Sequence, residues 1–575
     1  MSNGLVNLSN SNGLTVKSYT GDCCVMLAFN LEETKRAHLA GFAVRRRPVG
    51  GAWTELQNRL SFSTDYTSAT TAAQRKWFPT SEAPYQKFWW VDFPPENDSS
   101  NYEYEVTVMR FVEPHSATLK PDQKLTVTAS CKPFKQGNFQ LAFTRGYLSS
   151  QAYHDLFDNK PIRPDGAKSI SFDTAKFQKQ WAWLGANARK AATDFLVQAF
   201  KDATLSLDVF AYDLDEPDFI AAFKQFGSRL RIIVDNASLH IGPKAPEPLA
   251  VKALTATAGK ANVKTGHFGR YQHNKVFIVR RGQQALRVLT GSTNFSIAGL
   301  YVNANHVAIF DDADVAARYA EAFNTAFGTG VKLDKFNAAP IAAEAFEFKK
   351  TGLPTTYISF APHTPDTFSL DRLVKELKAA NSSVLFAVMA LKGSSGVLDI
   401  LRTIHDAGKV FSYGVTDDPG VKQDGAGDGV GKNGGVKVFA PNQPGVLVTS
   451  AALNKNVPPP FDKELQLGLT HKVHHKFVVV DFNDSDPVVF FGSSNFAKLG
   501  EENNGDNLIA IYDRDVATVF AIEAIRLVDH YAFRAAMTKA TDTKPMRLRF
   551  DDEDWAKNAY VEGNIKKTER VLFSK

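Results

Sequence analysis

Short segments that alternate hydrophobic and polar residues occupy the chain from about residue 14 to residue 135. One of them places Tyr102, Tyr104, Val106 and Val108 on one side of a strand, because successive side chains of a strand point to opposite faces. Clusters of Pro, Gly, Asn and Ser separate these segments, and this spacing is typical of a β-sandwich. Residues 1–138 are therefore predicted to form an all-β sandwich domain.

The pattern changes near residue 140, where helical and strand-like segments begin to alternate. Residues 183–203 have the periodicity of a helix, and residues 204–214 that of a buried strand. The same alternation restarts near residue 360. Alternation of this kind is typical of mixed, largely parallel sheets that are covered by helices. We therefore expect an α/β protein with two pseudo-symmetric lobes, residues 139–345 and residues 346–575, the second of which includes the C-terminal tail.

Two segments of the predicted lobes repeat in the same register. Each begins with a histidine that is followed by a lysine two residues later. A Gly-Ser-x-Asn sequence follows, with its asparagine 21 residues after the histidine, and a further polar residue lies 32 residues after it. The two sets are His273, Lys275, Ser292, Asn294 and Asn305, and His474, Lys476, Ser493, Asn495 and Asp506.

These residues fit the chemistry of a phosphate group. Residues two apart on a strand project to the same side, so each histidine lies beside its lysine. If the two strands meet about a pseudo-twofold axis, the ammonium and amide groups can stabilise charge on phosphoryl oxygens. We expect Ser292, Ser493 and Asn305 to take part in binding the substrate. One histidine can attack phosphorus while the other protonates the leaving oxygen, so this chemistry requires no metal and no cofactor.

The duplicated pattern resembles the phospholipase D superfamily, whose hallmark is His-x-Lys, then four residues and an aspartate, then Gly-Ser-x-Asn. The second copy is complete and includes Asp481, a supporting residue, whereas the first has Arg280 at the aspartate position. The resemblance implies a phosphohistidine intermediate, with His273 as the nucleophile and His474 as the general acid.

The resemblance also implies that the residue 32 positions after each histidine orients an imidazole. We expect the anionic Asp506 to keep His474 protonated, because a carboxylate neighbour favours the imidazolium form. The neutral Asn305 would fix the tautomer of His273 without adding charge. His475 is expected to face away from the site, because adjacent strand residues point in opposite directions.

Two other segments bear on function. Residues 41–51 include a predicted strand and a turn at Pro48, and with the alternating strands they resemble a fibronectin type III domain, whose protein partner the sequence does not indicate. Residues from about 418 to 461 are rich in Gly and Pro and precede His474, where an active-site lid would lie. An insertion without function fits this composition equally well.

Composition narrows the function only slightly. The 67 Lys and Arg against 61 Asp and Glu give a net charge of +6, without the dense basic stripe of a dedicated duplex-binding protein. Cys23, Cys24 and Cys131 do not suggest a disulfide framework or a structural zinc site. With neither a signal peptide nor a transmembrane segment evident, a cytoplasmic protein is expected, and the alternative is secretion by a route that uses no N-terminal signal. We expect a phosphodiesterase that acts on phospholipid, and the alternatives are a metal-independent nuclease and a non-catalytic phosphate-binding protein.

Overall fold

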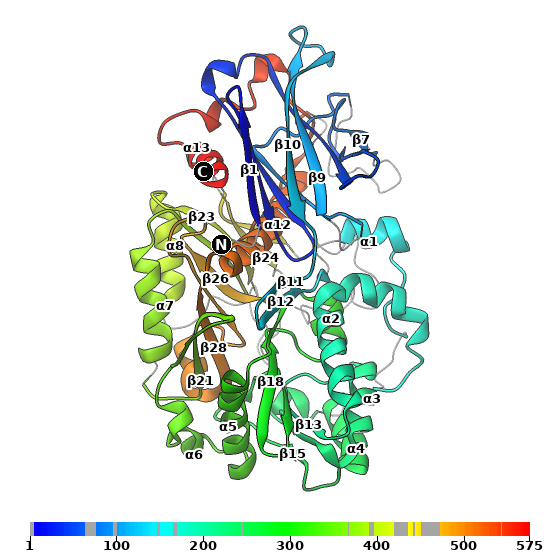
Figure 1. Cartoon of the computed structure of the whole chain (residues 1–575), viewed down its shortest axis with the longest axis vertical. Helices are drawn as coiled ribbons and strands as arrows, with labels where there is room; N and C mark the ends of the chain where they lie inside the picture. The colour runs from blue at the N-terminus through cyan, green and yellow to red at the C-terminus, as the bar shows by residue number, and fades with distance from the viewer. Residues whose placement is uncertain are drawn as a thin grey trace.

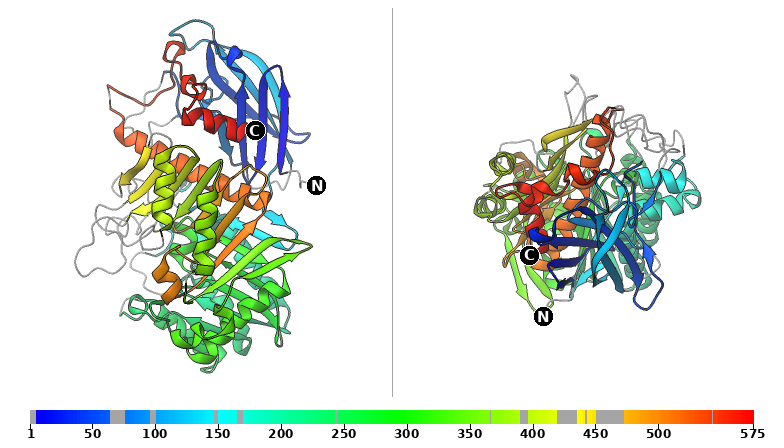
Figure 2. Two further views of the ribbon diagram at one scale, coloured as in Figure 1. Left: turned by 90° about the vertical axis from the view of Figure 1, so that its left-hand side faces the viewer. Right: turned by 90° about the horizontal axis from the view of Figure 1, so that it is seen from above.

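The computed structural model describes residues 5–63, 76–95, 101–146, 150–164, 170–242, 245–365, 367–389, 396–418, 435–440, 443–449, 472–541 and 543–575. In Figure 1 the all-β domain lies at the top of the view, and two α/β lobes lie side by side below it. Figure 2 shows the same separation from the side. No helix in these ranges combines the length and the apolar character that crossing a bilayer requires.

The N-terminal domain is a β-sandwich, as predicted. Its two antiparallel sheets have the strand orders β1-β2-β3-β8 and β10-β9-β4-β5, and a short pair, β6-β7, lies beside them. Tyr104, Val106 and Val108 are fully buried in the core that the two sheets share. The resemblance to fibronectin type III stays a prediction. The strands are β1 (Val6–Ser11), β2 (Leu14–Thr20), β3 (Val25–Leu31), β4 (Leu39–Pro48), β5 (Thr54–Glu55), β6 (Gln57–Asn58), β7 (Phe78–Pro79), β8 (Trp89–Asp92), β9 (Asn101–Phe111) and β10 (Leu119–Ser130).

The first lobe is built on an eight-stranded sheet with the order β11-β12-β19-β18-β17-β13-β14-β15. The sheet is mixed, but the prediction of largely parallel strands is wrong for it: parallel pairing joins β13 to β14 and β14 to β15, and the other neighbours are antiparallel. The reason is that β17 and β18 form a short hairpin and that residues 292–305 return the chain from β18 to an antiparallel β19, so no crossover to a parallel neighbour joins these strands. The strands are β11 (Phe134–Gln136), β12 (Phe139–Phe143), β13 (Leu205–Ala211), β14 (Leu230–Val234), β15 (Val263–Thr265), β17 (Val276–Arg281), β18 (Gln284–Gly291) and β19 (His306–Phe310).

The second lobe repeats this plan around a sheet with the order β20-β21-β28-β27-β26-β22-β23-β24-β25. Its parallel pair is β22 with β23. Part of the Gly- and Pro-rich segment belongs to this sheet, since β24 and β25 form a hairpin at its edge and Val436 and Val438 are fully buried. Residues 419–434 and 450–471 lie outside the described ranges. The strands are β20 (Phe346–Lys350), β21 (Leu353–Ala361), β22 (Ser383–Val388), β23 (Phe411–Asp418), β24 (Gly435–Ala440), β25 (Gln443–Thr449), β26 (Lys476–Val480), β27 (Val488–Gly492) and β28 (Asn504–Tyr512).

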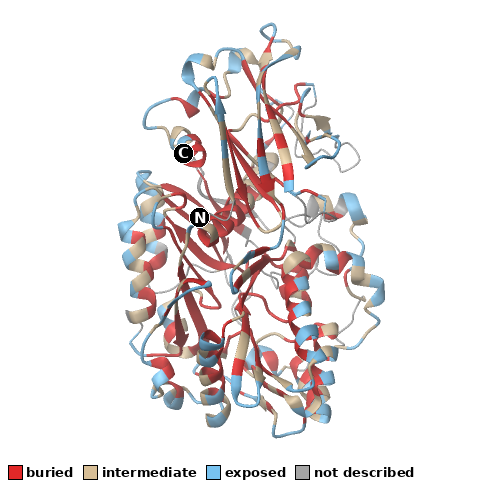
Figure 3. Ribbon diagram, viewed as in Figure 1, coloured by how far each residue is buried: buried red, intermediate tan, exposed pale blue. Residues whose placement is uncertain are grey.

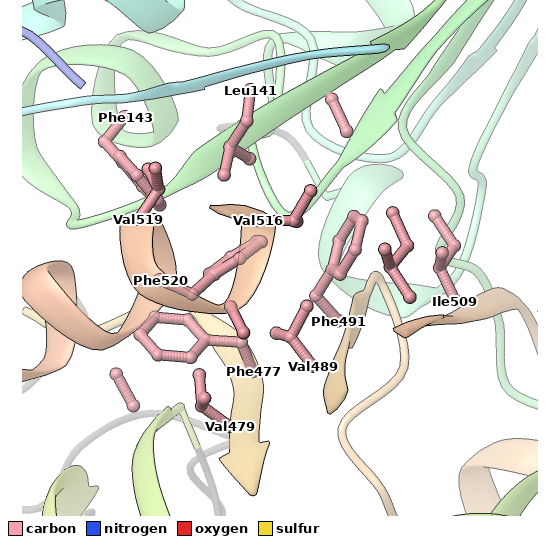
Figure 4. Close-up of a cluster of buried hydrophobic side chains, with 14 of the residues drawn as sticks. Leu141, Phe143, Phe477, Val479, Val489, Phe491, Ile509, Val516, Val519 and Phe520 are labelled. Carbon is pink, nitrogen blue, oxygen red and sulfur yellow. The ribbon is translucent and has the colours of Figure 1, made fainter. Parts of the chain in front are cut away.

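Two equivalent helices, α5 (Ala313–Thr329) and α12 (Arg514–Lys539), pack between the lobes. Each begins after an aspartate, Asp312 or Asp513, whose carboxylate accepts hydrogen bonds from the first free N–H groups of the helix. Figure 4 shows the shared core, in which the ring of Phe520 lies 5.4 Å from that of Phe143 and 4.9 Å from that of Phe477. In Figure 3 the buried residues accordingly concentrate in the two sheets and in this central layer.

The remaining helices cover the outer faces of the two sheets or link elements at their edges. The first lobe is covered by α2, α3 and α4, and the second by α7 and α8. The other helices are shorter, except α13 at the C-terminus. Their bounds are α1 (Ser150–Phe157), α2 (Gln178–Lys201), α3 (Pro217–Phe226), α4 (Glu247–Ala258), α6 (Leu333–Asn337), α7 (Thr367–Ala379), α8 (Val397–Ala407), α11 (Lys498–Asn503) and α13 (Ile565–Ser574).

The C-terminal tail, which the sequence pattern assigned to the second lobe, contacts that lobe through Phe573, whose ring lies 5.4 Å from that of Phe411, and it also packs on the sandwich. The Tyr560 hydroxyl donates to the carbonyl oxygen of Leu31 at 2.8 Å, and the Trp555 indole donates to that of Leu39 at 2.8 Å. At the other boundary, β11 precedes residue 139 but pairs with β12 in the sheet of the first lobe. Contacts between segments about 500 residues apart therefore fix the sandwich to the second lobe.

Candidate active site

The two histidine segments meet at the interface between the lobes. The residues before His273 form β16 (Tyr271–Gln272), which pairs in parallel with the start of β28 in the other lobe. The backbone N–H of His273 donates to the carbonyl oxygen of Gly505 at 2.8 Å. The second copy makes the equivalent contact, from the N–H of His474 to the carbonyl oxygen of Ala304 at 3.0 Å. The predicted convergence of the two copies is thus present, and the backbone of each lobe holds the histidine of the other.

This crossed pairing decides which residue orients each imidazole. Nδ1 of His273 lies 2.8 Å from Oδ1 of Asp506, and Nδ1 of His474 lies 2.9 Å from Oδ1 of Asn305. The expectation that Asp506 orients His474 and Asn305 orients His273 is therefore wrong. The physical reason is that Gly505 and Ala304 each bond to the histidine of the opposite lobe, so the next residue lies beside that histidine.

The electrostatics of the first histidine suit a neutral, oriented imidazole. Burial and the neighbouring Lys275 hold the pKa of His273 below its usual value, although Asp506 acts in the opposite direction. Burial also opposes ionisation of Asp506, but His273 and Lys275 keep the pKa of its carboxyl below the usual range. An ionised Asp506 accepts the hydrogen on Nδ1 and leaves the lone pair of His273 on Nε2.

The two lysines are buried beside the histidines. Lys275 and Lys476 are 1% and 0% exposed, and each Nζ donates to the backbone oxygen of the histidine two residues before it, at 2.8 Å for Lys476. Burial lowers the pKa of Lys275 to about 7, and burial together with Lys275 lowers the pKa of Lys476 well below its usual value. Two such groups gain their full charge when an anion enters between them.

The Gly-Ser-x-Asn turns depend on a close approach of two strands. Gly291 and Gly492 have φ angles of 139° and 145°, and a Cβ on either would lie 2.4 Å from a backbone oxygen of the neighbouring strand. Ser292 Oγ donates to Asn305 Oδ1 at 2.8 Å, and Ser493 Oγ accepts from the backbone N–H of Asn507 at 3.0 Å. Ser292, Ser493 and Asn305 are fully buried, so these contacts favour a positioning role over the expected contact with substrate.

The asparagines of these turns keep free acceptor atoms. Oδ1 of Asn294 and Oδ1 of Asn495 are buried and have no hydrogen-bond partner among the described residues. The Asn294 amide donates to the carboxylate of Asp213, which lies two residues beyond the end of β13. Sequence reasoning missed Asp213, although a polar residue at the carboxyl end of a buried strand is a signal for a site in an α/β sheet.

Two further aspartates accept hydrogen bonds from the backbone just before each histidine. Sequence reasoning missed both. Oδ2 of Asp235, which follows β14, accepts from the backbone N–H of Gln272 at 2.6 Å. Asp417, at the end of β23, accepts from the N–H groups of Lys472 and Val473 at 3.0 Å each. These residues occupy equivalent places in the two lobes and fix the backbone just before His273 and His474. In the sequence, the only signal for these two aspartates is their position at the carboxyl ends of strands predicted to be parallel.

Asp481 and Arg280, at the position of the motif aspartate, lie at the far ends of their strands from the histidines. The carboxylate of Asp481 accepts backbone N–H groups of Asn381 and Ser382, each at 2.8 Å, which caps the entry to β22. Arg280 instead lies 3.1 Å from the carboxylate of Asp208, which is fully buried and also paired with Arg231. Both residues therefore support the sheet and do not contact the histidine site.

His475 faces away from the site, as predicted. Its Nε2 lies 3.0 Å from Oε1 of Glu523, and its ring stacks on that of His306 at 5.4 Å. Burial lowers the pKa of His475, although Glu523 acts in the opposite direction. His475 therefore belongs to the core between the lobes.

Comparison with known proteins gives a family for this architecture. The family described as "Cardiolipin synthase, PLD-like domain" matches residues 196–327 and 373–527, which contain the two copies of the histidine, lysine and asparagine pattern. No curated protein sequence matches the chain. The chain belongs to the phospholipase D superfamily, and this assignment rests on the two matched segments.

Several solved structures resemble parts of the chain. Phosphatidylserine synthase from Haemophilus influenzae is 11% identical, with 66% of this chain and 90% of that chain covered and a TM-score of 0.37. Polyphosphate kinase from Porphyromonas gingivalis is 11% identical, with 66% and 53% covered and a TM-score of 0.36. The phospholipase D family member Nuc from Salmonella typhimurium is 21% identical, with 24% and 88% covered and a TM-score of 0.20.

Proposed function

We propose that the protein cleaves a phosphodiester, by hydrolysis or by transfer to an alcohol, through a covalent phosphohistidine on His273. The observation that carries this proposal is the crossed pair of contacts, Asp506 to His273 and Asn305 to His474. A carboxylate that holds Nδ1–H directs the Nε2 lone pair of His273 outward and stabilises the positive charge that develops when it attacks phosphorus.

His474 has the complementary role of proton donor. Its Nδ1 lies near two acceptors, Asn305 Oδ1 at 2.9 Å and the backbone oxygen of Ser292 at 3.1 Å, so Nδ1 carries a hydrogen. Nε2 is then the nitrogen that exchanges a proton with the reacting group. In the first step His474 gives its proton to the leaving oxygen as the His273–phosphorus bond forms. In the second step it removes a proton from water or alcohol, which attacks phosphorus and releases His273.

Lys275 and Lys476 supply the charge for the phosphoryl oxygens. Both are buried, and the charge of each lowers the pKa of His273. Preorganised donors of this kind stabilise a transition state more than a ground state, because charge on the equatorial oxygens grows during the reaction. No step of this mechanism requires a metal ion.

The substrate that we propose is a phospholipid. The matched family carries the description of a cardiolipin synthase domain, and this supports a lipid phosphodiester. An assay panel in EDTA tests the proposal with phosphatidylglycerol vesicles, phosphatidylcholine vesicles, and single- and double-stranded DNA. We expect the wild type to turn over lipid and the His273→Asn variant to have no such activity. Cleavage of DNA without turnover of lipid would show that the substrate is nucleic acid. No activity on any of these substrates would favour a phosphate-binding protein.

A further inference from the structure

A second group of ionisable side chains lies beside the histidine site, near the carboxyl ends of β13 and β14. Asp213, His240 and Glu247 each place a donor atom within 4.8 Å of the others. His240 and Glu247 are 6% and 3% exposed, whereas the side chain of Asp213 is 34% exposed. The group is therefore enclosed by protein on one side and reached by solvent on the other.

The geometry of His240 is that of an oriented ligand. Its Nδ1 lies 2.6 Å from Oδ1 of Asp235, and its Nε2 lies 3.0 Å from Oδ1 of Asp213. A histidine that holds a metal ion through one nitrogen commonly donates from the other to a carboxylate, which fixes the ring and its tautomer. Asp235 is itself fixed by the N–H groups of Gln272 and Ala237, so the imidazole is held in place from behind.

The carboxylate of Glu247 has one oxygen that the contacts within this group do not satisfy. One of its oxygens, Oε1, accepts from the backbone N–H of Leu214 at 3.1 Å. The other, Oε2, is buried and has no hydrogen-bond partner among the described residues. Burial raises the pKa of Glu247 to about 7. The contacts with His240 account for Asp235 and Asp213, whereas a buried carboxylate oxygen without a partner is costly and would be stabilised by a cation beside it.

We propose that Asp213, His240 and Glu247 bind a single divalent transition-metal ion of the Zn²⁺ or Mn²⁺ type. One imidazole nitrogen and two carboxylate oxygens are the ligands that such ions share, whereas Mg²⁺ and Ca²⁺ prefer oxygen alone. Tetrahedral bonds of about 2.0–2.2 Å place neighbouring donors about 3.3 Å apart, and the distance from His240 Nε2 to Asp213 Oδ1 is 3.0 Å, close to this value. Three protein ligands leave the solvent side open to water.

The cation site lies next to the groups that we assign to phosphodiester cleavage, but it is distinct from them. The second oxygen of Asp213 accepts from the amide of Asn294. The ring of Tyr212 contacts both imidazoles, at 4.5 Å from that of His240 and 4.7 Å from that of His273. An ion at this site therefore changes the charge next to Asn294.

Metal binding to the full chain tests the proposal independently of turnover. After treatment with EDTA and dialysis, calorimetric titration with ZnCl₂ and with MnCl₂ should show one tight site per chain. Glu247→Gln keeps the size of the side chain and removes its charge, and it should weaken binding by at least about tenfold. Glu216→Gln is the matched control. Glu216 is also a buried glutamate of the first lobe, and burial raises its pKa. It lies outside the cluster, where it caps α3. This control should bind as the wild type does.

A spectroscopic measurement on the wild type covers the case in which Glu247→Gln does not fold. Pulsed electron paramagnetic resonance of bound Mn²⁺ should detect coupling to one imidazole nitrogen, and Asp235→Asn should weaken binding by about 10- to 100-fold because the ring loses its support. The proposal is overturned if the wild type takes up neither ion, if bound Mn²⁺ shows no nitrogen coupling, or if Glu247→Gln and Glu216→Gln bind equally well.

Discussion

Asp506 of the second lobe lies 2.8 Å from Nδ1 of His273 in the first lobe, so the carboxylate and the imidazole that it orients come from opposite halves of the repeat. Neither lobe on its own holds a complete pair. This relationship makes the interface between the lobes the site itself, because any shift of one lobe against the other separates Asp506 from His273.

The first prediction concerns this contact. Asp506→Asn preserves the size of the side chain but removes the charge that stabilises His273 during attack, and we expect turnover to fall by about 10²- to 10⁴-fold. With a nitrophenyl phosphodiester, the burst of nitrophenolate should slow by a similar factor, since formation of the intermediate is the affected step. Asp481→Asn in the same lobe is the matched control and should retain turnover. A burst of normal rate in Asp506→Asn would remove the carboxylate from the mechanism.

The second prediction is a pH dependence of anion binding. The pKa of Lys275 is lowered by burial to about 7, so the free protein loses this positive charge as the pH rises through that value. A bound anion raises the pKa again, and the affinity for sulfate should fall by up to about tenfold per pH unit as the pH rises above 7. Sulfate does not titrate near neutral pH, so calorimetry isolates the protein groups. Lys275→Met should lose most of this dependence, whereas the exposed Lys190→Met should keep it; an unchanged slope in Lys275→Met would assign the proton elsewhere.

The third prediction concerns the residue that departs from the family pattern. Restoring the aspartate by Arg280→Asp places a second carboxylate beside the fully buried Asp208 and should lower the free energy of unfolding by about 3 kcal/mol. Arg280→Ala should lower the free energy of unfolding by less, because Arg231 remains paired with Asp208. It should leave turnover per folded molecule nearly unchanged.

Arg281→Asp is the control for this prediction, since Arg281 is 57% exposed and its ion pair with Asp202 is on the surface. Exposed pairs contribute less than about 1 kcal/mol. Denaturant unfolding of the three variants measures the differences. Equal losses in Arg280→Asp and Arg281→Asp would show that Asp208 does not depend on its neighbour at position 280.

The fourth prediction separates Asp481 from the catalytic set. Its carboxylate accepts several backbone N–H groups at the entry to β22, so Asp481→Ala should leave buried donors unpaired and cost about 1–3 kcal/mol of stability. Turnover at a temperature where the variant is folded should be within a few fold of the wild type. A large loss of turnover without a loss of stability would mean that Asp481 acts on the site.

The site residues were predictable from the sequence because the two copies share one register. His273 and His474, with their lysines and asparagines, stand at the same spacing in both halves, and duplication fixes their equivalence whatever the tertiary structure. The sandwich followed from the alternation of buried residues such as Tyr104 and Val106. Spacing identifies equivalent positions, but it does not say which position contacts which.

The features that the sequence did not indicate all depend on contacts between distant segments. The crossed pairing arises because β16 pairs with β28 of the other lobe, and no local pattern encodes that choice. The same holds for Asp213, whose contact with Asn294 spans two loops, and for Tyr560, whose hydroxyl reaches Leu31 at the other end of the chain. Parallel pairing was overestimated because helices and hairpins can both separate buried strands in the sequence.

The proposed mechanism depends above all on which histidine carries the phosphoryl group. His474→Asn removes the proton donor, but nitrophenolate needs little protonation as it leaves, so this variant should still form the intermediate and then stall, because the second step lacks its base. Peptide mapping by mass spectrometry after reaction with a nitrophenyl phosphodiester should place the phosphoryl group on the peptide that contains His273, and His273→Asn should carry none. A phosphoryl group on the peptide that contains His474 in the wild type would contradict the assignment of His273 as the nucleophile, and with it the catalytic role of the contact between Asp506 and His273.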